Sequence, residues 1–148
     1  QQVLVVHGVH FRELDLRELA HLGVSVVACP RSNKYVGAGS PPLASFYEAG
    51  LNVAIGTDSL ASAPDLNIFS ELFEARRIAP SVPARALLQS ATVNGARALG
   101  FDKDYGSIEP GKRASLITVD MPANEEDVEE HLLSGIQPSD VNWIEAEI

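Results

Sequence analysis

Histidine, arginine, asparagine and aspartate side chains follow three apolar runs of the sequence, and side chains of these types can bind metals and polar ligands. The first run ends at His7, the second leads into Arg31 and Asn33, and the third leads to Asp58. Functional groups of parallel α/β folds gather just past the carboxyl ends of the strands, so we expect one shared edge. Imidazole and carboxylate groups can hold a divalent ion that makes hydroxide available near neutral pH. The pattern therefore favours a hydrolytic metal site.

Each of these residues also has a structural interpretation. A histidine at a strand end is often a hydrogen-bonded structural residue, and an aspartate beside Ser59 can cap a turn or a helix. Arg31 can pair with a surface acid. Cys29 is expected to be a buried strand terminus, because nothing nearby would activate a thiolate. The histidines away from strand ends are interpreted as structural or surface residues: His10, His21 and His131.

Three apolar, β-branched runs predict the strands that position these side chains: residues 3–6, 24–29 and 51–55. They are nearly continuous rather than alternating, which favours a parallel sheet covered on both faces. Helical patterns between them end at Gly23 and Gly50, where a helix C-cap favours a positive φ. This order fits right-handed βαβ crossovers, so a doubly wound sheet and a stretch of (β/α)₈ barrel are both open.

The second half of the chain is predicted to be mainly helical at first. Asp65 is a candidate N-cap for a helix that begins just after it, and two further helices are expected near residues 84–91 and 93–99. Turn residues then lead into a strand at 114–119, which follows three helices and need not belong to the main sheet. Residues 126–133 have a weak amphipathic helical pattern, and no clear period follows them.

The charge of the chain is concentrated near one end. The 148 residues carry a net charge of -9, yet residues 1–120 hold 12 acids and 11 bases, whereas 121–148 hold eight acids and no base. The main body is thus nearly neutral, which argues against nucleic-acid binding through a basic face. The acidic end is interpreted as a solvated or interaction segment.

Length and composition predict a soluble globular protein with one core, either one domain or part of a larger one. Hydrophobic residues make up 45% of the chain and charged residues 21%. The chain starts at Gln1, and an apolar run follows almost at once, so we expect a cut end. A single cysteine favours a reducing cytoplasm, and the sequence supports neither secretion nor membrane insertion.

Five motifs taken together resemble the amidohydrolase superfamily, in the branch of cytosine, guanine and S-adenosylhomocysteine deaminases and triazine hydrolases. Their joint occurrence in the family's order is far more specific than any one of them. They cover His7-Gly8-Val9-His10, Cys29-Pro30-Arg31-Ser32-Asn33, Gly56-Thr57-Asp58-Ser59, the stretch from Ala91 to Gly100, and Gly106-Ser107-Ile108-Glu109-Pro110-Gly111-Lys112.

The resemblance implies an α/β fold in which the three strands are the sixth, seventh and eighth of a (β/α)₈ TIM barrel. Asp58 matches the aspartate that ends strand eight, binds the metal and receives a proton from the attacking water. His7 matches the histidine of strand six that faces the metal-bound water and the polarised substrate. The turn at 106–112 resembles the return of the chain to a small β-domain. The implied divisions are barrel 1–104, small β-domain 105–120 and acidic segment 121–148.

The sequence departs from the family pattern at both ends. The His-x-His pair of strand one, the metal-binding histidine of strand five and the glutamate acid/base after it would all precede Gln1. One carboxylate and one histidine cannot complete a four-ligand zinc site, and no general acid remains for a leaving amine. We therefore expect the isolated chain to be inactive. The end after Asp120 is expected to be acidic and helical instead of forming closing strands.

The resemblance implies a cytoplasmic hydrolase that uses zinc, with iron as an alternative. It is expected to cleave a C-N bond of a purine, pyrimidine or related heterocycle through metal-bound hydroxide, as an aminohydrolase (deaminase). Arg31 and Asn33 are the candidate substrate-binding residues, and a pocket-facing Arg31 would favour an anionic small-molecule substrate. A homo-oligomer is expected, or a chain that needs its missing N-terminal part, with no nucleic-acid or membrane partner.

Three alternatives remain beside this interpretation. A chlorohydrolase or cyclic-amide hydrolase of the same superfamily would use the same residues. A non-catalytic fragment or module would be completed by another chain, because three barrel strands alone leave two open edges. A small doubly wound binding domain is disfavoured, since no glycine-rich phosphate loop follows any strand.

Overall fold

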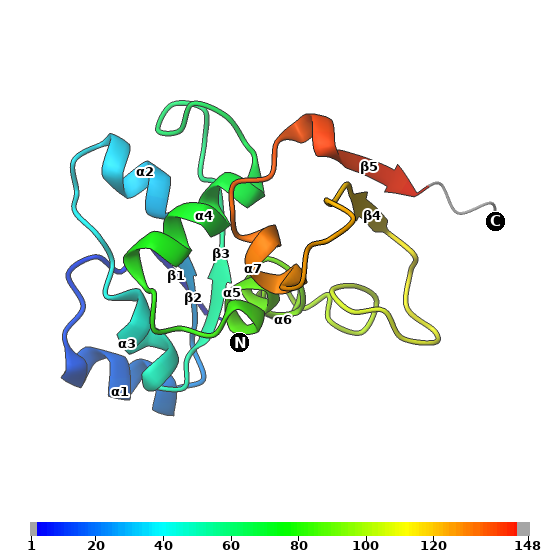
Figure 1. Ribbon diagram of the computed structural model, residues 1–148. Helices are drawn as coiled ribbons and strands as arrows, with labels where there is room; N and C mark the ends of the chain where they lie inside the picture. The colour runs from blue at the N-terminus through cyan, green and yellow to red at the C-terminus, as the bar shows by residue number, and fades with distance from the viewer. Residues whose placement is uncertain (1–2, 145–148) are drawn as a thin grey trace.

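The computed structural model describes residues 3–144 and places three parallel strands at the centre of the larger part of the molecule (Figure 1). These strands are β1 (Leu4–Val6), β2 (Ser25–Ala28) and β3 (Asn52–Ile55), and they lie side by side in that order. The register aligns Val5 with Val26 and Val26 with Val53. The predicted parallel α/β arrangement is confirmed, because each strand follows the last through a helical connection.

The helices that connect and cover this sheet follow from the apolar faces of the sequence. They are α1 (Glu13–His21), α2 (Pro30–Tyr35), α3 (Leu43–Glu48), α4 (Ile68–Ile78), α5 (Ala84–Ser90) and α6 (Val93–Leu99). Val26 and Val53 pack with Phe46, Leu72 and Leu87 in one buried cluster. Burial of such side chains contributes about 1.5–3 kcal/mol each, so this cluster fixes the helices against the sheet.

Glycines end α1 and α3 as the sequence predicts. Gly23 and Gly50 have φ values of 66° and 74°, and each begins the turn into the following strand. The backbone N–H of Val24 donates to Leu19, and that of Leu51 donates to Phe46. These bonds satisfy carbonyl groups that a helix end leaves unpaired, and the glycine makes the left-handed turn without steric cost.

The predicted N-cap of α4 is wrong by two residues. The side chain of Asn67, not that of Asp65, accepts the backbone N–H of Phe69 at the start of α4. Asp65 instead accepts the backbone N–H of Asn67 and pairs with Arg31. The two candidate acceptors are close in sequence, and the tertiary pairing with Arg31 decides between them.

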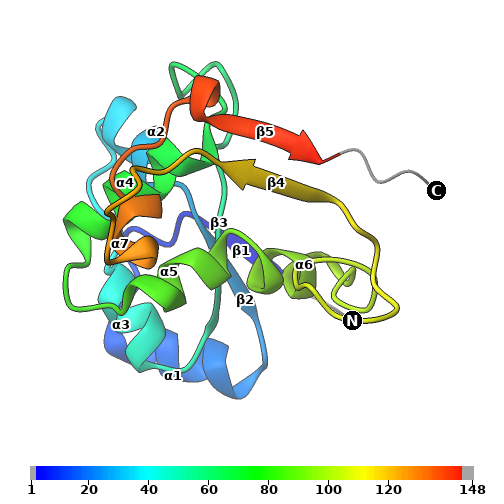
Figure 2. The same cartoon turned by 45° about the vertical axis from the view of Figure 1, so that its right-hand side comes forward.

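A second, two-stranded sheet lies beside the larger part (Figure 2). The strand predicted at 114–119 is β4 (Leu116–Val119), and it leaves the main sheet to pair antiparallel with β5 (Val141–Ile144). Between them lie α7 (Val128–Leu132) and a short 3-10 helix, η1 (Pro138–Asp140). The end after Asp120 was expected to be helical without closing strands. This expectation is wrong, because residues 141–144 form β5 and pair with β4.

Within residues 3–144, no helix combines the length and the apolar character that crossing a membrane requires.

Candidate functional site

Side chains that follow all three parallel strands line one pocket of about 580 Å³. His7 follows β1, Ser32 and Asn33 lie in α2 after β2, and Asp58 follows β3. Ser62, from the loop after β3, completes the polar side. The apolar side is formed by Val6, Val9, Phe11, Val36 and Ala38. The sheet therefore brings His7, Asn33 and Asp58 together, as their places at strand ends predict.

The backbones of His7 and Asp58 have the same unusual conformation. Their φ values are 71° and 61°, and within residues 3–144 no other non-glycine residue has a positive φ. Such conformations cost about 1–3 kcal/mol and persist where surrounding contacts hold them, often at functional sites. Hydrogen bonds hold the strand end, since the N–H of His7 donates to Val27 and that of Gly56 donates to Ala28.

The carboxylate of Asp58 is kept anionic by two hydroxyl groups. The hydroxyls of Ser32 and Ser62 donate to Oδ2 over 2.6 Å and 2.9 Å. These bonds, first that of Ser32, hold the pKa of Asp58 below its usual range. An anionic carboxylate with a third of its side chain exposed can bind a cation or accept a proton.

Two nitrogen atoms in the pocket have no hydrogen-bond partner among the described residues. They are Nδ1 of His7 and Nδ2 of Asn33, and both are buried. Nε2 of His7 lies 3.9 Å from Oδ2 of Asp58. Asn33 is only 2% exposed. Buried polar atoms without a partner are costly, so these groups are suited to a ligand or to further protein atoms.

Arg31 does not line this pocket. Its guanidinium makes two hydrogen bonds to the carboxylate of Asp65, over 2.7 Å and 2.9 Å, and lies 3.8 Å from Glu71. The Asp65 carboxylate raises the pKa of Arg31 further. The expected pairing with an acid is therefore found with Asp65. A contact between Arg31 and a substrate carboxylate stays a prediction.

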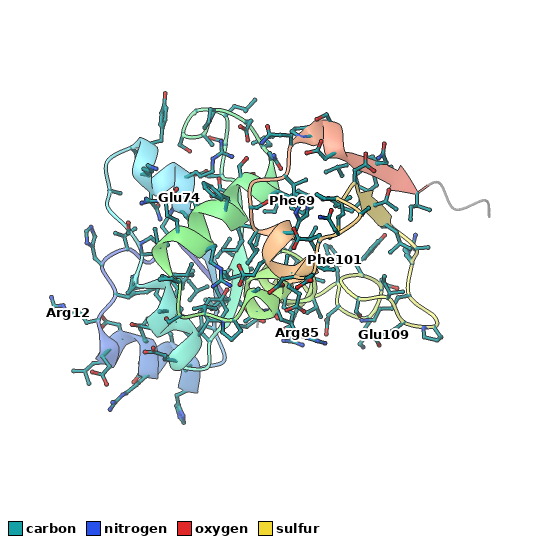
Figure 3. The ribbon with its side chains drawn as sticks, viewed as in Figure 1. Arg12, Phe69, Glu74, Arg85, Phe101 and Glu109 are labelled. Carbon is teal, nitrogen blue, oxygen red and sulfur yellow. The ribbon has the colours of Figure 1, made fainter. Side chains whose placement is uncertain are left out.

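Two glutamates on α4 contact residues of α2. Glu71 is fully buried, and its Oε2 accepts the backbone N–H of Arg31 near the start of α2. Burial raises the pKa of Glu71 to about 7. Glu74 lies between α4 and α2 (Figure 3), where it pairs with Lys34 over 3.4 Å and with Arg77 over 2.6 Å. These contacts fix the helix that carries Ser32.

Cys29 and the three other histidines do not join His7 and Asp58 as candidate site residues. Burial raises the pKa of Cys29 to about 12, so its thiol stays protonated, as expected for a buried strand terminus. His10 borders the pocket but is exposed, and His21 is exposed at the end of α1. His131, in α7, lies 3.4 Å from Glu125.

Comparison with known proteins decides the family. The model of the amidohydrolase family matches residues 1–141. The chain belongs to the amidohydrolase family. The resemblance that the five motifs carry is thereby confirmed.

Curated relatives of this amidohydrolase are named as deaminases. A 5-methylthioadenosine/S-adenosylhomocysteine deaminase of Moorella thermoacetica is 40% identical, and the match covers 96% of this chain and 36% of that protein. The enzyme of that name from Halobacterium salinarum is 44% identical over 126 residues, 80% of this chain and 29% of that protein. The chain thus spans about a third of the length of these relatives.

Solved amidohydrolase structures share the fold. An adenosine deaminase from Xanthomonas campestris with bound zinc is 38% identical, with a TM-score of 0.88, and the match covers 93% of this chain and 34% of that one. Guanine deaminase of E. coli is 25% identical with a TM-score of 0.81, over 93% and 36%. An atrazine chlorohydrolase from Arthrobacter aurescens complexed with zinc is 27% identical with a TM-score of 0.77, over 88% and 32%.

The donor set of the pocket fits one ligand position of a metal site, not a whole site. Among residues 3–144, no three His, Cys, Asp or Glu side chains lie close enough to hold a metal ion together. Asp58 is anionic and partly exposed, which suits a divalent cation. The other ligands of a tetrahedral zinc site would have to come from outside these residues.

Sequence patterns do not identify Ser62 as a pocket residue, nor Asp65, Glu71 and Glu74 as the acids that contact α2. Ser62 lies four residues after Asp58 in a loop, and no periodic pattern marks it. Ser32 stands in the motif at 29–33, but the motif alone does not indicate a role for its hydroxyl. The sequence pattern gives no signal for Glu71 and Glu74, because acids on a helix are expected to be exposed, whereas both are buried here.

Proposed function

We propose that this chain supplies strands six to eight of a (β/α)₈ barrel in a zinc-dependent deaminase, with the division into 1–104, 105–120 and 121–148. The observation that carries the proposal is the pairing of His7 with an anionic Asp58 at the carboxyl ends of β1 and β3. The family supports it, as do relatives named as deaminases and a neighbouring structure with zinc. A longer protein would supply the remaining ligands.

Asp58 is the residue of this chain that would hold the metal. Bound zinc would polarise the substrate and lower the pKa of a coordinated water molecule. The Asp58 carboxylate then accepts the proton that the attacking water loses, because the serine hydroxyls keep the carboxylate ionised beforehand. Nε2 of His7 lies beside the same carboxylate and stabilises the charge that develops on the substrate.

The proposed reaction replaces an exocyclic amino group of a purine nucleoside with oxygen. Water forms a C–O bond at the ring carbon, and the C–N bond breaks. One of the two water protons leaves on ammonia, and the other stays on the product, which carries it on a ring nitrogen in its keto form. The apolar wall of Val6, Val9 and Phe11 suits the flat face of a heterocycle. Asn33 is the proposed polar contact, because its buried Nδ2 is unpaired among the described residues. Cytoplasmic localisation and a homo-oligomer remain part of the proposal.

A second reaction of the same site is hydrolytic dechlorination of a triazine. Dechlorination is a candidate because the chain is similar to the structure of an atrazine chlorohydrolase, at 27% identity. Both reactions attack an electron-poor ring carbon with water and differ in the leaving group. The higher identity to proteins named deaminases, 40% and 44%, makes deamination the first choice.

The test is a substrate comparison with the full-length, zinc-loaded protein that contains this chain. We expect ammonia release from 5'-methylthioadenosine or S-adenosylhomocysteine, and no chloride release from atrazine. Asp58→Ala should abolish the reaction, whereas His21→Ala, at an exposed position on α1, should retain it. If the protein acts on atrazine and not on the two nucleosides, its assigned function would be dechlorination instead of deamination. Absence of both activities, or full activity of Asp58→Ala, would contradict the proposal.

A further inference from the structure

Two buried serine side chains from different parts of the chain converge on one oxygen atom of Asp58. Ser32 is 1% exposed and Ser62 is 9% exposed. Their hydroxyl oxygens lie 2.6 Å and 2.9 Å from Oδ2 of Asp58 and 3.0 Å from each other. The three oxygens therefore form a compact triangle at the inner side of the pocket.

The number of protons fixes the direction of these hydrogen bonds. A serine hydroxyl has one proton, and an ionised carboxylate only accepts. Ser32 is closer to Asp58 than to Ser62, and the distance from Ser62 to Asp58 is shorter than that to the carbonyl of Ser59, 3.4 Å. Both hydroxyls thus donate to Oδ2, and Oδ1 receives neither of them.

The two serines also connect the segments that follow β2 and β3. Ser32 lies in α2, and Ser62 lies in the loop that carries Asp58. The bond between Arg31 and Asp65 joins the same two segments farther from the pocket. Since the backbone of Asp58 has a φ of 61°, its side-chain direction depends on such contacts.

We propose that Ser32 and Ser62 are positioning residues that hold Oδ2 of Asp58 and leave Oδ1 as the oxygen that binds a divalent cation. The inference rests on the proposed function, because it takes Asp58 as a metal ligand. Two charge-assisted hydrogen bonds to one oxygen restrict rotation of the carboxylate and favour a single metal-oxygen contact. Groups that orient metal ligands in this way are often worth 10-fold to about 100-fold in metal affinity.

The test measures zinc affinity by chelator competition in the full-length protein, with the melting temperature of the metal-free form as a second readout. We expect Ser32→Ala and Ser62→Ala each to lower zinc affinity by about 10-fold. Ser62→Thr keeps a hydroxyl and should stay within about threefold of the wild type. Ser90→Ala is the matched control, because Ser90 is fully buried but its hydroxyl contacts Tyr47 instead of Asp58.

Two results would overturn the inference: wild-type zinc affinity in both Ser32→Ala and Ser62→Ala, or an equal loss in Ser90→Ala. If the wild-type protein itself binds no zinc, the proposed function fails. In that case, crystal structures of the metal-free wild type and of the double variant Ser32→Ala/Ser62→Ala show whether the serines position the Asp58 carboxylate. A turned Asp58 carboxylate in the double variant supports positioning by the serines, and an unchanged one contradicts it.

Discussion

Nε2 of His7 lies 3.9 Å from Oδ2 of Asp58, although the two residues follow strands that are separated by β2. Both have a left-handed backbone, which turns each side chain away from the path of its strand. This relationship places one carboxylate and one imidazole close together at the same edge of the sheet. The sheet order alone brings the two residues to the same edge, and the hydroxyls of α2 and the following loop fix the carboxylate.

Substitution of His7 should reduce turnover without loss of bound zinc, in contrast to substitution of Asp58. If the proposed function holds, His7→Ala is expected to lower kcat of the full-length protein by about 10²-fold to 10⁴-fold, because charge stabilisation is lost, while bound zinc is retained. The measurement is steady-state kinetics together with zinc content. His21→Ala, at an exposed helix position, serves as the control. Loss of zinc from His7→Ala would make His7 a metal ligand instead.

Arg31 is expected to stabilise the fold rather than to select substrates. Its two hydrogen bonds to Asp65 join α2 to the loop that carries Asp58, so Arg31→Ala should lower stability by about 1–3 kcal/mol. Arg17→Ala removes an exposed pair with Glu13 on α1 and should cost less than about 0.5 kcal/mol. Chemical denaturation compares the two variants.

Substrate kinetics separate this role from the substrate-binding role predicted from the sequence. S-adenosylhomocysteine carries a carboxylate and 5'-methylthioadenosine does not. We expect Arg31→Ala to leave the ratio of their kcat/KM values within about threefold of the wild type, because Asp65 already occupies the guanidinium. A selective loss for S-adenosylhomocysteine of about 10-fold or more would restore Arg31 as a substrate-binding residue.

Glu71 should make stability depend on pH. Its pKa is raised to about 7 by burial; Arg31 lowers it, and Asp65 and Glu74 raise it. The folded state therefore holds this proton more tightly than the unfolded state, and stability falls as pH rises from about 4.5 to about 7. Glu71→Gln should remove that fall, which is on the order of 3 kcal/mol.

The measurement for Glu71 is the melting temperature of the metal-free protein at about pH 5 and about pH 8. The difference between the two pH values should shrink in Glu71→Gln. Glu48→Gln, at an exposed position of α3, should behave as the wild type does. An unchanged pH dependence in Glu71→Gln would show that Glu71 titrates as an exposed acid does.

Gly106 is expected to be required by packing as well as by backbone conformation. It has a φ of 95°, and an added Cβ would lie 2.7 Å from Cα of Val93 and 2.8 Å from Cβ of Ala96. Gly111 has a similar φ of 92°, and nothing lies within 4 Å of its added Cβ. Gly106→Ala should therefore cost about 1–3 kcal/mol more than Gly111→Ala in chemical denaturation. Equal costs would mean that α6 moves to accommodate the methyl group.

Local patterns were sufficient for much of the sheet and its helices. The apolar runs placed β2 and β3, and Gly23 and Gly50 marked two helix ends, because these signals depend on neighbouring residues. The start of α4 was misjudged, since the choice between Asp65 and Asn67 depends on Arg31, far away in sequence. Local patterns do not predict β5, because this strand pairs with β4, which α7 and η1 separate from it along the chain.

The part of the site that depends on local sequence could also be predicted. His7 and Asp58 stand directly after strands, and a parallel sheet must bring such positions to one edge. The roles of Ser62 and Glu71 depend on the course of a loop and on the packing of α4 against α2, which no local period encodes.

The most direct test of the central claim is a crystal structure of the full-length protein that locates zinc by anomalous scattering. The account predicts one zinc ion at about 2.0–2.2 Å from Oδ1 of Asp58, with the Ser32 and Ser62 hydroxyls still on Oδ2. A fully loaded zinc site that does not include Asp58 would contradict the account.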